Sequence, residues 1–139
     1  MSIALRLSAV AMVLLTAACA GRSQELSQRQ ADSFERYRQF AGEPVKDFHF
    51  WNLDRWEVLG PLDLVVWTNT VDAYLLHVSR PCTGLEFAQA IGVSSTQNRV
   101  YTRFDSVSFE MQKCRIAEIR PVDGKAYKAA RREARALEG

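Results

Sequence analysis

The chain has 139 residues, of which 47% are hydrophobic and 24% are charged, and its formal net charge is +2. This length is sufficient for one domain and too short for two of ordinary size. The composition argues against global disorder, and the small net charge argues against a nucleic-acid partner.

The N-terminal segment has the features of an export signal. Residues 1–7 carry a single charge, Arg6, and residues 8–18 contain no charged residue. An apolar run of eleven residues spans only about 17 Å as a helix, well short of the roughly 30 Å hydrocarbon core of a bilayer. We therefore expect residues 1–18 to be a cleaved signal peptide rather than a transmembrane helix.

The signal ends in a motif that predicts lipidation. The run Leu15-Thr16-Ala17-Ala18-Cys19 resembles the lipobox of bacterial lipoproteins, with Thr16 in the place usually taken by leucine. The resemblance implies that Cys19 is acylated and becomes the new N-terminus, so that its acyl chains anchor the protein in a membrane. Ala20 stands where an aspartate would favour inner-membrane retention, which implies the periplasmic face of the outer membrane. The alternative is an ordinary secretory signal that is cut near Ala18 or Ala20.

Export also predicts how the other two cysteines are used. In an oxidising compartment, Cys82 and Cys114 remain as a pair once Cys19 is acylated, so we predict a disulfide between them. It would close a loop of about 33 residues and contribute roughly 3 to 4 kcal/mol in the chain-entropy model. A redox pair and a metal site are the alternatives, but the sequence has no C-x-x-C and no further ligands at metal spacing. No cofactor is expected.

The mature protein is predicted to begin with a tether and a short helix. Residues 19–30 combine the lipidated cysteine with a polar stretch rich in Ser, Gln and Arg, which is typical of a tether without regular structure. Residues 31–139 are then expected to form a single β-rich domain. Within residues 31–41, Phe34, Tyr37 and Ala41 recur at helical spacing and predict a short amphipathic helix.

From residue 45 the sequence is typical of β-strands. Short runs rich in Val, Leu, Trp, Tyr and Phe are separated by turn residues, and the first four should form an antiparallel meander. The spacing of Leu85, Ala88 and Ile91 predicts a helix of at most two turns after Cys82. The predicted strands before this helix are 45–53, 55–59, 62–68 and 73–79. Strands are expected to resume after it, and the last one covers residues 114–121.

Two further features complete the predicted fold. Val100 and Phe104 share one parity, whereas Val107, Phe109 and Met111 share the other, so a bulge or turn near Asp105 is needed to place both sets in the core. Residues 125–138 predict a C-terminal helix, in which one apolar face carries Tyr127, Ala130, Ala134 and Leu137. The predicted fold class is α+β and mainly β: a small antiparallel sheet or partly closed barrel of five to seven strands with these two helices.

A spaced set of residues resembles a known family. The set consists of Trp56-Glu57, Val66-Trp67-Thr68, Ala73-Tyr74-Leu75-Leu76, Pro81-Cys82, Leu85, Arg103-Phe104-Asp105 and Cys114-Arg115-Ile116. It is similar to an uncharacterised family of small proteobacterial exported proteins, a domain of unknown function, from about residue 41 to residue 122. The resemblance implies export, a single domain and the pairing of Cys82 with Cys114, and it implies no activity.

The sequence contains no catalytic signature, and we expect the protein not to be an enzyme. It has no G-x-S-x-G elbow, no H-E-x-x-H, no P-loop and no dinucleotide-binding fingerprint. His49 and His77 are the only histidines, and with Asp105 or Glu110 they would supply an acid/base or metal set. The simpler interpretation is that both histidines pack and hydrogen-bond on a half-buried sheet. A small periplasmic hydrolase that uses His49 or His77 is the alternative function.

Two groups of residues predict a binding surface. Trp51, Trp56 and Trp67 are concentrated within 17 residues, and any of them left exposed would offer an apolar contact. Residues 111–139 hold eight basic and four acidic side chains, whereas residues 22–110 hold nine basic and twelve acidic. The predicted C-terminal helix should therefore dock on an anionic surface, which is either an envelope protein or lipid headgroups. The alternative is that it lies solvated on the domain. Its basic residues are Lys125, Lys128, Arg131, Arg132 and Arg135. The predicted function is a non-catalytic interaction module of the cell envelope, with a purely structural envelope protein as a further alternative.

Overall fold

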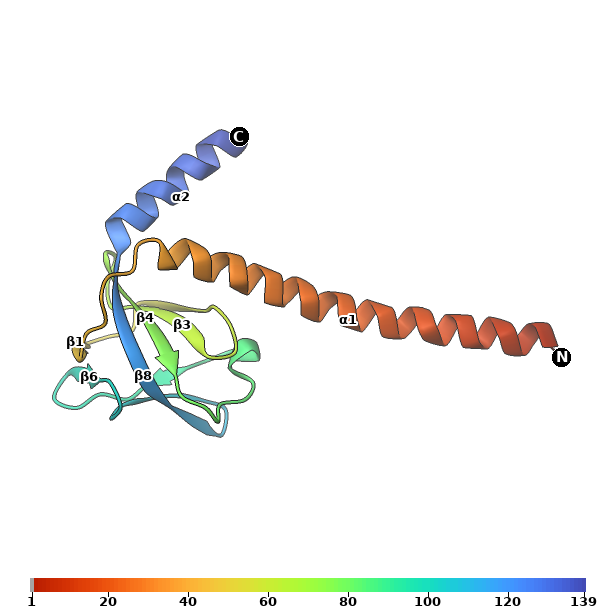
Figure 1. Ribbon diagram of the computed structural model, residues 1–139, viewed down its shortest axis with the longest axis horizontal. Coiled ribbons are helices and arrows are strands. Elements are labelled where there is room, and N and C mark those ends of the chain that lie inside the picture. Colours follow the sequence, from red (N-terminus) through yellow and green to blue (C-terminus); the bar gives the residue numbers. More distant parts are fainter. Residues whose placement is uncertain (1) are drawn as a thin grey trace.

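The computed structural model describes the backbone from residue 2 to residue 139 and the side chains from residue 19 onward. A long helix, α1 (Ser2–Arg38), is followed by a β-rich body and a C-terminal helix, α2 (Gly124–Glu138) (Figure 1). The strands are β1 (Asp47–His49), β2 (Arg55–Val58), β3 (Asp63–Trp67), β4 (Asp72–Val78), β5 (Gly92–Val93), β6 (Arg99–Tyr101), β7 (Ser106–Phe109) and β8 (Gln112–Asp123). The predicted α+β class is confirmed.

Six strands form one antiparallel sheet in the order β2-β3-β4-β8-β7-β5, which curls into a half-barrel. Strand β8 makes the curl possible because it is twelve residues long and pairs with β7 near its start and with β4 along the rest. A register shift in β4 between His77 and Val78 accompanies this change of partner. The β3–β4 turn is closed by Asn69, whose Oδ1 accepts hydrogen bonds from the backbone N–H groups of Val71 and Asp72, both at 2.8 Å.

The first predicted strand is placed differently from our expectation. We expected residues 45–53 to lead a four-stranded meander, but only β2, β3 and β4 form one. Strand β1 covers three residues and pairs with β6, in a separate two-stranded sheet. Short connections favour neighbouring strands, but here Phe48 of β1 is buried in the body, so burial decides its place.

The concave face of the half-barrel holds the larger core, the inner core. Its centre is formed by buried residues from β3, β4, β7 and β8, and Phe48 closes one end by stacking on Tyr74 with ring centroids 4.1 Å apart. Val100, Val107 and Phe109 lie in this core as expected. Phe104 and Met111 do not: they are exposed because both lie in turns, after β6 and between β7 and β8.

The opposite face of the sheet carries a second cluster, the outer core, which both helices cover. Leu64 and Val66 of β3 point into the inner core, whereas Val65 and Trp67 point into the outer core. This explains why β3 is an unbroken apolar run rather than an alternating one, since a strand covered on both faces needs no polar side. Tyr37 from α1 and Tyr127 from α2 complete the outer core.

Helix α1 is longer than the predicted helix over residues 31–41. The segment that we expected to be an unstructured tether, residues 19–30, is helical. Its Gln, Glu, Arg and Leu residues are good helix formers, and two side-chain pairs at i,i+4 spacing support the helix: Glu25 with Arg29, and Gln28 with Asp32. The predicted signal peptide, residues 1–18, lies outside the residues whose side chains are described. Within the described part of the chain, no helix combines the length and apolar character that a membrane span requires.

Helix α2 agrees with the predicted C-terminal helix, and the other predicted helix is shorter than expected. The backbone N–H of Ala126 donates to Asp123 Oδ1 at 3.0 Å, which caps the start of α2. After Cys82 there is only a single 3-10 turn, η1 (Leu85–Phe87), because Ala88 adopts an extended conformation that ends the helix. Leu85 is nevertheless buried in the inner core, as its place in the predicted pattern requires.

Candidate functional site

The three cysteines occupy two different settings. Cys19, the predicted lipidation site, is exposed on α1. Cys82 and Cys114 are joined by a disulfide, with their Cα atoms 5.6 Å apart, as the sequence predicts. The bond ties the segment before η1 to β8, and Cys114 is buried in the inner core. This bond therefore belongs to the framework of the domain.

The three tryptophans do not form one surface. Trp51 is 76% exposed in the loop after β1, whereas Trp67 is 1% exposed beneath the two helices. Trp56 lies between these extremes and packs against the inner core from β2. Trp51 alone offers the exposed apolar contact that we predicted for the group.

The basic residues of α2 face a second element that sequence reasoning did not connect with them. Four of them, Lys128, Arg131, Arg132 and Arg135, line one wall of a groove of about 390 Å³. Arg55 of β2 lines the other wall together with Glu57, and Tyr37 and Tyr127 lie at the bottom. We call this feature the cationic groove. The fifth predicted residue, Lys125, is exposed on α2 and does not line the groove.

Trp67 holds both walls of the cationic groove in place. The guanidinium carbon of Arg55 lies 4.1 Å from the centroid of the Trp67 ring, and Lys128 Nζ lies 5.2 Å from it. Arg55 is the cross-strand partner of Trp67, and Lys128 also contacts the carbonyl oxygen of Thr70. Cations over an aromatic face are attracted by its negative electrostatic potential. The buried Trp67 thus gathers positive charge at the base of α2.

One carboxylate faces the basic residues of the cationic groove. The hydroxyl of Tyr37 donates to Glu57 Oε2 at 3.2 Å. Burial raises the pKa of Tyr37, so this phenol stays protonated and remains a donor. Within residues 19–139, the side chains of Arg55, Arg131, Arg132 and Arg135 form no salt bridge. The groove therefore has an excess of positive charge.

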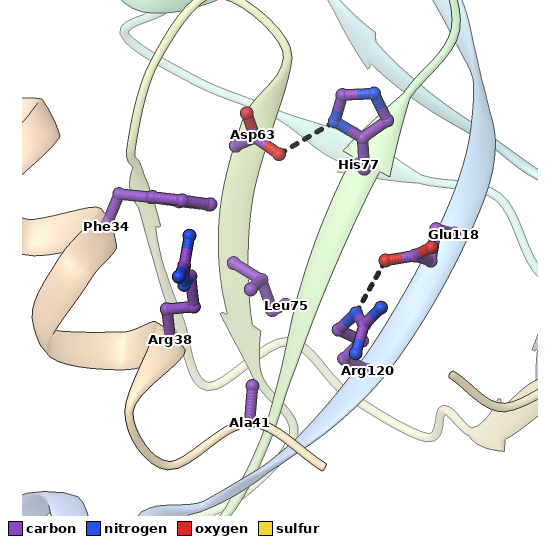
Figure 2. Close-up of a pocket in the computed structure, with 8 residues that line it drawn as sticks. All are labelled: Phe34, Arg38, Ala41, Asp63, Leu75, His77, Glu118 and Arg120. Atoms are coloured by element: carbon purple, nitrogen blue, oxygen red, sulfur yellow. Dashed lines mark hydrogen bonds and ion pairs between the residues drawn. The ribbon is translucent and has the colours of Figure 1, made fainter. Parts of the chain in front are cut away.

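His77 lies in a different groove, on the outer face of the sheet beside the end of α1 (Figure 2). Its Nδ1 is 2.8 Å from Asp63 Oδ1, and Glu118 is its partner on the other neighbouring strand. The groove has a volume of about 680 Å³, and Arg120 and Arg38 also line it. The sequence suggested Asp105 or Glu110 as the acidic partner of His77, and this prediction is wrong. The antiparallel register places Asp63 and Glu118 beside His77 instead.

The His77 groove has a base but lacks a nucleophile. Hydrogen bonding of Nδ1 to Asp63 orients the ring and leaves Nε2 free to accept a proton. None of the described residues that line this groove is Ser, Thr, Cys or Lys. The arrangement can orient a water or a polar ligand, and it offers no side chain for covalent catalysis.

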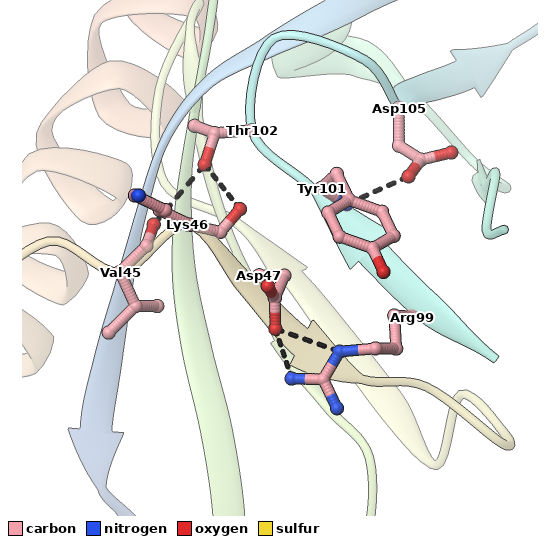
Figure 3. Close-up of polar contacts among 7 residues, drawn as sticks. All are labelled: Val45, Lys46, Asp47, Arg99, Tyr101, Thr102 and Asp105. Atoms are coloured by element: carbon pink, nitrogen blue, oxygen red, sulfur yellow. Dashed lines mark hydrogen bonds and ion pairs between the residues drawn. The ribbon is translucent and has the colours of Figure 1, made fainter. Parts of the chain in front are cut away.

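Asp105 has a structural role next to the turn after β6 (Figure 3). It is 2% exposed, and its carboxylate accepts from the Ser94 hydroxyl and from the backbone N–H of Tyr101, both at 2.7 Å. Nearby, Arg99 Nε donates to Asp47 Oδ1 at 2.8 Å across the β1–β6 pair, and this hydrogen bond raises the pKa of Arg99. Asp105 is thus fully used in holding the β6–β7 connection.

His49 is exposed on β1 and lies in neither groove. Among the residues with described side chains, no cluster of three or more His, Cys, Asp or Glu has the arrangement of a metal site.

The comparisons with known proteins give a family. Neither a curated protein nor a solved structure matches the chain. One family matches residues 1–138, and its description is a family of unknown function, DUF6491. The match covers the half-barrel, both helices and all three cysteines. The chain therefore belongs to the DUF6491 family of unknown function.

Proposed function

We propose that this protein is a lipid-anchored binding module of the cell envelope. Its membrane attachment is through acyl chains on Cys19, and its binding surface is on the folded body. The observation that carries the proposal is that Cys19 is exposed on α1, and Figure 1 shows that this helix extends away from the β-rich body. An acylated residue there leaves the whole body accessible to partners.

Helix α1 would act as a spacer between membrane and body. From Cys19 to Tyr37 it covers about 27 Å at the rise of an α-helix. It is held at its C-terminal end, where Gln30 Nε2 donates to the carbonyl oxygen of Glu86 at 2.9 Å and Tyr37 is buried in the outer core. Contacts with the body at this end, together with an exposed Cys19, are what a spacer requires. Ala20, next to Cys19, favours the periplasmic face of the outer membrane.

A serine substitution tests the lipid anchor. The Cys19→Ser variant should take up no labelled fatty acid in growing bacterial cells, and its mature form should leave the membrane fraction. A matched control is Cys82→Ser, which removes a different cysteine and should keep the label. Equal labelling of Cys19→Ser and the wild type would contradict the proposal, because the acyl chains would then be attached elsewhere.

The alternative function, a small periplasmic hydrolase, has one observation in its favour. His77 is oriented by Asp63 in an open groove, which is the arrangement of a general base that activates water. Hydrolysis by this route needs a substrate bound within reach of Nε2. The His77→Ala and Asp63→Asn variants decide between the functions: an enzyme loses turnover in both, whereas a binding module keeps its interactions with envelope extracts in both.

A further inference from the structure

We propose that the cationic groove between α2 and β2 is a binding site for a phosphoryl group that carries two or more negative charges. The groove combines Lys128, Arg131, Arg132 and Arg135 on one side with Arg55 on the other. This inference names the ligand of the proposed binding module and in that sense rests on the proposed function. Such a group occurs both in a phosphomonoester lipid headgroup and in a soluble phosphate monoester, and vesicle binding separates the two sources.

The groove has an excess of positive charge. Its lining has five basic side chains and one carboxylate, Glu57, which already accepts a hydrogen bond from Tyr37. Like charges this close repel one another, and they are screened less in a groove than on an open surface. Since the four arginines have no salt-bridge partner among residues 19–139, a bound anion would relieve this repulsion. An anion with several charges relieves this repulsion more than a single carboxylate does.

Most of the basic side chains in the groove are arginines. Guanidinium groups bind phosphate oxygens through pairs of parallel N–H donors, which makes arginine the usual residue for this recognition. Arg55 comes from a strand and Arg131 from a helix, so the donors converge from two sides. The contact of Arg55 with Trp67, at 4.1 Å, holds one of these side chains in place before a ligand arrives. Less conformational entropy is then lost on binding.

The floor of the groove is rigid. Tyr37 and Tyr127 stack with ring centroids 4.1 Å apart, and both are buried. The phenol of Tyr37 stays protonated and therefore adds no negative charge. The volume of about 390 Å³ accommodates a phosphoryl group together with part of the molecule that bears it. The stacked tyrosines therefore hold the floor of the groove fixed before a ligand binds.

The experiment titrates purified full-length protein in non-ionic detergent with pyrophosphate at an ionic strength of about 0.15 M, using calorimetry. We expect saturable binding by the wild type, and at least about tenfold weaker binding by the Arg131→Gln/Arg132→Gln variant, because two charge-assisted contacts are lost. The matched control is Lys125→Gln/Arg115→Gln, which removes two positive charges from exposed positions outside the groove. It should bind within about twofold of the wild type, because long-range charge alone contributes little.

Vesicles identify the source of the phosphoryl group. If the ligand is a lipid headgroup, the groove variant should lose binding to vesicles that contain phosphatidic acid, whose headgroup is a phosphomonoester. The control variant should keep this binding, with phosphatidylcholine vesicles as the zwitterionic reference. If vesicle binding is the same in both variants while pyrophosphate binding falls only in the groove variant, the ligand is a soluble ester. Arg135→Gln, at an exposed position on α2, serves as a second groove variant if the double variant fails to fold.

Two outcomes would overturn the inference. One is the absence of saturable pyrophosphate binding by the wild type, and the other is equal weakening in the groove and control variants. Pyrophosphate titration does not depend on acylation, and fatty-acid labelling does not depend on the groove. A failure of this inference is therefore distinguishable from a failure of the proposed lipid anchor.

Discussion

Tyr37 of α1 and Tyr127 of α2 stack face to face, with ring centroids 4.1 Å apart and ring planes inclined by 10°. Ninety residues separate them in the chain, and their contact joins the two helices above Trp67, whose ring centroid is 6.4 Å from that of Tyr37 and 6.0 Å from that of Tyr127. Beyond its first turns, α2 is exposed. The stack is therefore the main apolar contact that holds α2 on the body and shapes the cationic groove.

Truncation of Tyr127 should release α2. We expect Tyr127→Ala to lower the free energy of unfolding by about 3 kcal/mol, since a buried aromatic ring and its stacking partner are both lost. Urea unfolding followed by tryptophan fluorescence measures the loss. The control is Leu137→Ala on the same helix, which is 89% exposed and should change stability by less than about 0.5 kcal/mol. Equal effects of the two substitutions would contradict the view that the stack holds α2.

Gly124 is required for the close approach of α2 to the β3–β4 turn. A Cβ atom at this position would lie 2.1 Å from the carbonyl oxygen of Val71 and 2.7 Å from Cζ3 of Trp67. Backbone and a buried ring cannot move aside cheaply, so Gly124→Ala should destabilise the protein by about 2 kcal/mol despite the higher helix propensity of alanine. Gly60→Ala, where a Cβ meets no atom within 4 Å, is the matched control and should be nearly neutral. Thermal unfolding compares the two, and a neutral Gly124→Ala would show that α2 can shift without cost.

The fold was predictable from the sequence wherever one local signal acted alone. The runs that became β2, β3 and β4 are bounded by Gly60-Pro61 and by the turn at Asn69, and the C-terminal helix follows from its composition. Prediction failed where tertiary contacts decided. Strand β1 pairs with β6 because Phe48 is buried there, and α1 extends through a segment that looked like a tether.

The candidate sites were predictable only in part, for a related reason. The charge of α2 is visible in the sequence, but its partner Arg55 lies about 70 residues earlier and is brought to the groove by the pairing of β2 with β3. In the same way, the carboxylate beside His77 is Asp63, which the strand register selects. Composition identifies which residues are available for a site, whereas register and packing determine which of them meet.

The buried Tyr37 should make stability fall at alkaline pH. Burial raises the pKa of Tyr37 in the folded protein, whereas the pKa of a tyrosine in the unfolded chain is about 10. The unfolded state therefore loses its proton first, so this stabilisation is complete below about pH 10 and is lost as the pH rises above it toward the folded pKa. Urea unfolding at a series of pH values from 8 to 11 measures the slope.

A phenylalanine variant isolates this contribution. Tyr37→Phe loses the hydrogen bond to Glu57 and should be about 1 kcal/mol less stable at neutral pH. Its stability should then decrease less steeply above about pH 10 than that of the wild type, because one titrating group is gone. Burial also raises the pKa of Tyr74, so some alkaline dependence remains in the variant. Parallel pH profiles would show that Tyr37 ionises as it does in the unfolded chain.

Asp105 should be important for stability rather than for activity. Its carboxylate is buried and accepts hydrogen bonds from the Ser94 hydroxyl and the Tyr101 N–H. Asp105→Ala leaves both donors without a partner, and we expect a loss of about 3 kcal/mol in urea unfolding. Ser94→Ala keeps the bond from Tyr101 and removes the bond to Asp105, together with the acceptor of the Ser106 N–H at 2.8 Å. Because that N–H is exposed and water can replace its acceptor, the loss should be about 1 kcal/mol. If the two variants lose the same amount, the bond to Tyr101 contributes nothing.

Substitutions of the two disulfide cysteines, Cys82 and Cys114, should differ in their effect on stability. Either Cys82→Ala or Cys114→Ala removes the crosslink across 32 residues, which should lower the free energy of unfolding by roughly 3 kcal/mol. Cys114 is 2% exposed in the inner core, whereas Cys82 is only partly buried. Cys114→Ser therefore also places a hydroxyl among apolar side chains, and it should be less stable than Cys82→Ser by a further amount of about 1 to 2 kcal/mol. Urea unfolding of the two serine variants, each beside wild type treated with a thiol reductant, measures both effects. Reduced wild type should be about as stable as Cys82→Ser, and identical stability of the two serine variants would contradict the burial of Cys114.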